Sequence, residues 1–146
     1  MIPRRPLLLA LLFAACINDD LEVYEVVLSG TVSVAGAIAD PGEVHLELHY
    51  ASRGQGELET PLGKIDSTVE PDLGPTQWVT YVPLGRGRGL VLYGWLDRDG
   101  DGLLCAPGAF PEPAGAVELN GFPDHTLDFS LALDTDCAGP SALYPP

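Results

Sequence analysis

The sequence predicts an all-β protein that folds as an antiparallel two-sheet sandwich of about seven strands. Three observations support this prediction: apolar and polar residues alternate along most of the chain, short alternating runs are separated by turns, and helical periodicity is absent after the first 15 residues. The 17 glycines and 14 prolines supply those turns, because they accept positive φ or preset a bend. Short strands at such spacing are typical of a sandwich.

The clearest strand covers residues 44–50, where Val44, Leu46, Leu48 and Tyr50 share one face and polar residues occupy the other. Residues 90–96 are apolar on both faces, which predicts a central strand covered on each side. Further strands are expected at residues 23–35, 76–83, 116–119 and 125–134, with a weaker one at 58–67. The pair Arg86 and Arg88 falls in a glycine-rich turn, which we expect to close a hairpin.

The first 15 residues are typical of an export signal, which would form a helix before cleavage. Arg4 and Arg5 precede nine apolar residues, 7–15. As a helix these would rise about 13 to 14 Å, well short of the roughly 30 Å hydrocarbon core, so they predict a removable signal and not a permanent anchor.

The segment Leu12-Phe13-Ala14-Ala15-Cys16 resembles the bacterial lipobox, with Phe13 where leucine is usual. The resemblance implies that Cys16 is acylated and becomes the new N-terminus, so that acyl chains are the membrane partner. The alternative is an ordinary secretory signal that leaves Cys16 as a thiol or disulfide partner. Both interpretations place the protein outside the cytoplasm.

The predicted organisation is a signal peptide at residues 1–15, an acylated tether at 16–21 and one sandwich domain at 22–146. Ile17 follows the cysteine, and it is not the aspartate that resembles an inner-membrane retention signal in enteric bacteria. We therefore expect a cell-envelope location on the outer membrane if the host has two membranes, either on the periplasmic face or at the cell surface.

Cysteine number supports the lipid interpretation. Acylation of Cys16 leaves Cys105 and Cys137, which we expect to form a disulfide in an oxidising compartment. The mature chain keeps five basic and 21 acidic residues, a net charge of −16 with neutral histidines. This charge disfavours binding to nucleic acid and electrostatic binding to anionic headgroups.

The motif Asp97-Arg98-Asp99-Gly100-Asp101-Gly102 follows the most apolar strand. Carboxylates at alternate positions repel one another, and a hard divalent cation such as calcium relieves that repulsion. Asp97, Asp99 and Asp101 are therefore candidate calcium ligands. The loop is not an EF-hand, because Gly108 stands where the bidentate glutamate belongs. The alternative is a solvated acidic turn without metal.

This strand and loop, followed by Glu112-Pro113, resemble a loop of exported transthyretin-like and carboxypeptidase-regulatory-like sandwich domains. The resemblance covers about a third of the mature chain, and it implies a sandwich of transthyretin-like or immunoglobulin-like type. Glu112 or a backbone carbonyl near Leu103 is then a candidate to complete a calcium site.

The function class expected is a membrane-anchored structural or interaction module with no catalytic residues and no cofactor other than calcium; its envelope protein or glycan partner is not identified by the sequence. One alternative is a carbohydrate- or peptide-binding module that uses Trp78, Tyr81, Tyr93 and Trp95. The other is a hydrolase, for which His125 has no recognisable nucleophile in the sequence. Metal binding by His45, Glu47 and His49 is disfavoured, since residues i and i+4 of a strand lie about 13 Å apart.

Overall fold

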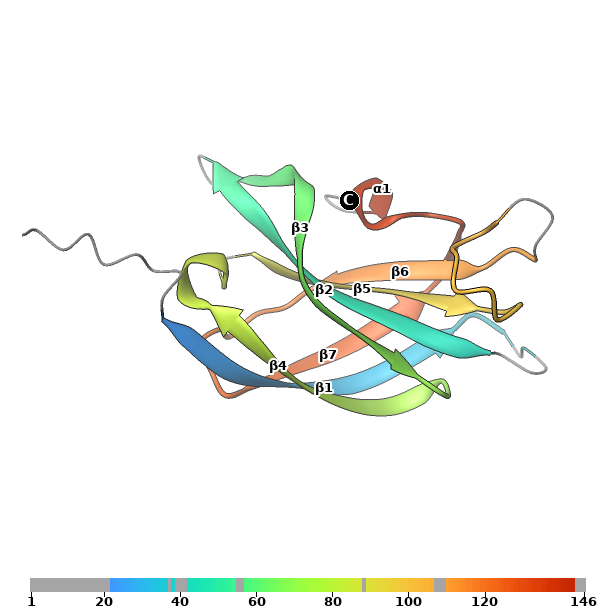
Figure 1. Cartoon of the computed structure of the whole chain (residues 1–146), viewed down its shortest axis with the longest axis horizontal. Helices are drawn as coiled ribbons and strands as arrows, with labels where there is room; N and C mark the ends of the chain where they lie inside the picture. Colours follow the sequence, from blue (N-terminus) through green and yellow to red (C-terminus); the bar gives the residue numbers. More distant parts are fainter. Residues whose placement is uncertain are drawn as a thin grey trace, which may run out of the picture.

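The computed structural model confirms a β-sandwich of two packed sheets (Figure 1). It describes residues 22–36, 38, 42–54, 57–87, 89–106 and 110–143, with backbone alone between 52 and 62. The signal at 1–15, Cys16 and the tether at 16–21 lie outside these residues. The strands are β1 (Val23–Val34), β2 (Glu43–Gly54), β3 (Glu57–Glu70), β4 (Gly74–Pro83), β5 (Leu90–Asp97), β6 (Pro113–Glu118), β7 (Thr126–Leu133) and β8 (Thr135–Asp136), followed by the short helix α1 (Pro140–Leu143).

The three-stranded sheet has the order β4-β1-β7. β1 pairs antiparallel with β4, whereas β1 and β7 run parallel, with Val27 opposite Thr126 and Val34 opposite Leu133. The expectation of purely antiparallel pairing is wrong for this pair. Side-chain alternation has the same period in parallel and antiparallel strands, so the sequence pattern carries no information about direction.

The five-stranded sheet has the order β3-β2-β5-β6-β8, and its paired strands are antiparallel. β5 lies in the middle and all eight of its residues are buried, as its apolar faces predict. Leu90, Leu92 and Leu96 face the core between the sheets. The opposite face of β5 carries Tyr93 and Trp95, which pack with Ala114, Ala116, Leu104 and Leu143. The loop after β5 and the C-terminal segment therefore cover the outer face of this sheet.

The main core lies between the two sheets and is made mostly of alternate residues from β1, β2, β5 and β7, with Val82 from β4. Burying each of these aliphatic side chains contributes about 1.5 to 3 kcal/mol before the entropy of ordering is subtracted. The predicted inward face of residues 44–50 is confirmed for Val44, Leu46 and Leu48. The principal members are Val26, Leu28, Val32, Val44, Leu46, Leu48, Leu90, Leu92, Leu96, Leu127, Leu131 and Leu133.

The expectations for the strand at residues 58–67 and for the turn near Arg86 both need correction. The weak strand expected at residues 58–67 is real and longer, because β3 spans Glu57–Glu70 and pairs with β2. The turn near Arg86 does not close a hairpin, because β4 and β5 belong to different sheets; the 3-10 turn η2 (Leu84–Arg86) begins a crossing between them. Among the described residues, no helix is long and apolar enough to cross a membrane.

Candidate metal centre

The loop after β5 is organised by the carboxylate of Asp97, the last residue of that strand. The Asp97 side chain is 2% exposed. Its Oδ1 accepts a hydrogen bond from the Gly100 amide at 2.7 Å, and its Oδ2 accepts one from the Gly102 amide at 2.8 Å. Both glycines have positive φ, 74° and 73°, a conformation that other residues rarely adopt. The Asp-Gly spacing in the sequence therefore folds the chain back over its own strand end.

Glu112 ties this loop to the rest of the domain from a fully buried position, just before β6. Its Oε1 accepts a hydrogen bond from the Arg98 amide at 3.1 Å, and its Oε2 accepts one from the Cys105 amide at 2.5 Å. Its backbone carbonyl accepts a third from the Cys137 amide at 2.9 Å. One residue thus joins the start of the acidic loop, its far end and the C-terminal segment.

The predicted disulfide is present between Cys105 and Cys137, whose Cα atoms lie 5.4 Å apart. It links the end of the acidic loop to the segment that follows β8. The same segment is held by the Tyr93 hydroxyl, which donates to the Ala138 carbonyl at 2.9 Å. Burial raises the pKa of Tyr93, so this donor keeps its proton at neutral pH.

Three carboxylates converge at this end of the sandwich. Oxygen atoms of Asp97, Asp99 and Glu112 all lie within 4.8 Å of one another. Asp101, the third ligand expected from the sequence, does not belong to this group; its Oδ1 accepts a hydrogen bond from the Leu103 amide at 2.7 Å. Glu112, the candidate named to complete the site, is the third member instead.

The spacing of these oxygens would allow one divalent cation to contact all three carboxylates. Oxygen ligands lie about 2.3 to 2.6 Å from calcium, so two oxygens on opposite sides of one ion are roughly 4.6 to 5.2 Å apart. Magnesium requires about 2.0 to 2.1 Å and octahedral geometry, which places the same pair roughly 4.2 Å apart, also inside the 4.8 Å limit. Each carboxylate oxygen has two lone pairs, so one amide contact leaves a position for a cation.

The groups that interact with the Asp97 carboxyl are the amides of its own loop and the ring of His45. Burial opposes ionisation of the Asp97 carboxyl, but the amides of Gly102 and Gly100 and the nearby His45 outweigh it and lower the pKa of Asp97. His45 Nε2 lies 3.6 Å from Asp97 Oδ2, and the His45 ring stacks on Trp95 at 4.3 Å between centroids. The Arg98 guanidinium turns away to the Pro111 carbonyl and the Phe110 ring.

His45 is a neighbour of the centre that the sequence reasoning missed. It had been considered only with Glu47 and His49 on its own strand. The signal that could have found it is the antiparallel pairing of β2 with β5, which puts Glu43 opposite Asp97 and His45 opposite Trp95. Strand pairing must be known before that signal can be read.

Comparison with protein-family models, with curated proteins and with solved structures finds no match for this chain. The resemblance of the acidic loop to transthyretin-like domains therefore stays an expectation from the sequence.

The remaining candidate residues are dispersed. Trp95 is buried on the five-stranded sheet, while Trp78 belongs to the three-stranded sheet and packs against the main core, so they do not share an exposed face. His125 is exposed, and its Nδ1 lies 3.3 Å from the Glu25 carbonyl. His49 is buried and lies 2.8 Å from the Glu47 carboxylate. The hydrogen bond to His49, with a smaller one from Lys64, outweighs burial and lowers the pKa of Glu47.

Proposed function

We propose that the mature protein is a membrane-anchored envelope lipoprotein whose sandwich domain acts as a structural or interaction module, with a calcium ion bound by Asp97, Asp99 and Glu112. The observation that carries the calcium part is the convergence of three carboxylates, two of them buried, within 4.8 Å. The anchoring part rests on the lipobox-like sequence at Cys16.

The arrangement of the domain supports a division of roles between its ends. β1 begins at one end of the sandwich, seven residues after Cys16, and the acidic loop lies at the opposite end, where β5 finishes (Figure 1). Under this proposal the acyl chains hold one end at the membrane, and the calcium-stiffened loop is presented away from it. Any partner would meet a loop made rigid by a cation, a disulfide and buried hydrogen bonds.

Calcium binding predicts a concentration-dependent gain in stability. Calcium at about 5 mM should raise the free energy of unfolding by roughly 1 to 2 kcal/mol over the chelated protein, if affinity is on the order of 0.1 to 1 mM as in extracellular modules. The measurement is thermal melting with calcium and with chelator. Coinciding melting curves would show that the acidic loop is an ordinary turn that does not bind calcium.

Two matched variants distinguish calcium binding at this site from a general stabilisation that calcium would give by screening the negative charge of the protein. Asp99→Asn removes an exposed carboxylate of the cluster and should abolish the calcium response. Asp101→Asn removes another exposed carboxylate two residues away, outside the cluster, and should preserve it. An equal loss in both variants would contradict the assigned ligands.

Anchoring through Cys16 has its own test. Cys16→Ala, or treatment with the lipoprotein signal peptidase inhibitor globomycin, should leave the precursor uncleaved and prevent acylation. Processing is followed by gel mobility, and acylation by incorporation of labelled palmitate. Normal cleavage of the Cys16→Ala chain to its mature length would contradict the lipoprotein proposal and would not bear on the calcium proposal.

A further inference from the structure

One edge strand of the sandwich is protected against strand addition only at its two ends. The edges of the two sheets are β4 and β7 in one sheet and β3 and β8 in the other. An exposed edge presents unpaired N–H and C=O groups, and proteins protect it with charged side chains, bulges, short strands or proline. Each edge can be compared with that list.

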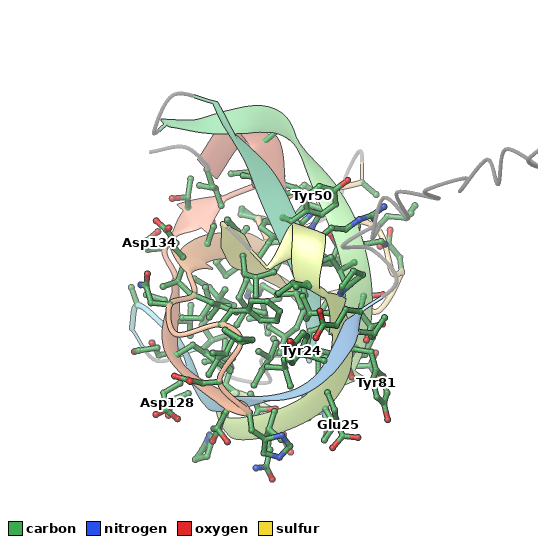
Figure 2. The ribbon with its side chains drawn as sticks, turned by 90° about the vertical axis from the view of Figure 1, so that its left-hand side faces the viewer. Tyr24, Glu25, Tyr50, Tyr81, Asp128 and Asp134 are labelled. Carbon is green, nitrogen blue, oxygen red and sulfur yellow. A yellow bond between two sulfur atoms is a disulfide. The ribbon has the colours of Figure 1, made fainter. Side chains whose placement is uncertain are left out.

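Three of the four edges are protected. β3 carries charged residues and has two register shifts against β2. β8 is only two residues long. β7 carries Asp128, which projects outward (Figure 2), and the chain after it turns against β6, where the Asp134 amide donates to the Ala114 carbonyl.

β4 differs from these three, because its only protecting residues are the prolines at its two ends, Pro75 and Pro83. Its ten residues, Gly74–Pro83, pair with β1 in continuous register without a bulge. It is the one strand among those described that has no charged side chain, in a chain with 21 acidic residues. Its outer face also exposes Val79 by 51% and Tyr81 by 60%, and Tyr81 projects away from the sheet in Figure 2. β4 is therefore a long edge without a bulge whose own side chains are uncharged, with the Asp66 carboxylate beside Thr80 and the Glu25 carboxylate beside Tyr81.

The prolines of β4 select a symmetric partner. Pro75 and Pro83 lie at equal distances on either side of Val79. If a second β4 strand pairs antiparallel about Val79, both prolines of each copy fall at the ends of the shared ladder, where their missing N–H groups interrupt no central hydrogen bond. Val79 then meets Val79 of the other copy, and Gln77 meets Tyr81, so no like charges face each other across the pair.

We propose that β4 is a self-association edge, through which two copies of this chain pair antiparallel about Val79 and join their three-stranded sheets into one sheet of six strands. The neutrality of β4 is what allows this contact, because two domains of high negative charge repel wherever their acidic residues meet. The pairing depends neither on acylation of Cys16 nor on calcium binding at the Asp97 loop. Acylation would only raise the local concentration of the two copies.

The test measures the molar mass of the purified full chain in mild detergent by size-exclusion chromatography with light scattering, over a hundredfold range of concentration. The wild type should move from monomer to dimer. Val79→Lys places two like charges face to face and should weaken dimerisation by about tenfold or more. Ser130→Lys puts the same charge on an exposed position of β7, at the other edge of this sheet, and should dimerise like the wild type.

Cysteine crosslinking tests the register. Val79→Cys should form a disulfide-linked dimer under mild oxidation. Gln77→Cys, on the same exposed face, should not, since two Gln77 positions would lie about 13 Å apart in this register. The wild type, which keeps Cys16, measures background crosslinking. A wild type that stays monomeric, a dimer unaffected by Val79→Lys, or equal crosslinking at positions 77 and 79 would each overturn the proposal.

Discussion

Replacing Glu112 with alanine is expected to lower the free energy of unfolding by about 2 to 6 kcal/mol. The substitution removes the acceptor of the Arg98 and Cys105 amides, and each buried donor left without a partner costs about 1 to 3 kcal/mol. Because Glu112 is fully buried, water has little access to replace it. The measurement is urea unfolding in the presence of chelator, so that loss of calcium does not contribute.

Tryptophan fluorescence gives a local readout of the same change. Trp95 is 6% exposed and lies beneath the loop and the C-terminal segment, so loosening of that cover should shift its emission to longer wavelength. Glu43→Ala is the control, because Glu43 is exposed on the adjacent strand opposite Asp97, and it should change stability by no more than about 0.5 kcal/mol. Equal effects of the two substitutions would contradict the structural role given to Glu112.

Removal of the disulfide is the second large expected effect. The Cys105→Ala/Cys137→Ala variant should lose about 3 to 4 kcal/mol of unfolding free energy, since the bond joins residues separated by 32 positions and restricts the unfolded chain. The comparison is urea unfolding of this variant beside the wild type, with and without reductant. Reductant should destabilise the wild type by a similar amount and leave the variant unchanged.

The effects of the disulfide and of Glu112 should not add. The Cys105 amide donates to Glu112, and the Cys137 amide donates to the Glu112 carbonyl, so both changes release the same segments. A triple variant that loses the full sum of both effects would show that the two contacts act independently. Free thiols at both cysteines in non-reducing mass mapping would remove the disulfide prediction altogether.

Several features of the fold follow from the sequence alone because local chemistry determines them. Alternation of period two identifies the inward face of β2, and a run that is apolar on both sides identifies β5 as central, since only a covered strand can keep both faces apolar. Three cysteines, of which Cys16 is expected to be acylated, leave Cys105 and Cys137 as the pair. The Asp-Gly pattern predicts a tight acidic loop, because glycine accepts the positive φ at positions 100 and 102.

Other features depend on which strands become neighbours, and this only the tertiary structure decided. The parallel pairing of β1 with β7 could not be read from alternation, which is identical for both strand directions. Glu112 replaces Asp101 in the carboxylate cluster because the chain returns through β6 beside β5, and His45 lies next to Asp97 because β2 pairs on the other side. Residue type and spacing set the local conformation of the Asp97 loop, whereas the composition of its carboxylate cluster was set by long-range strand pairing.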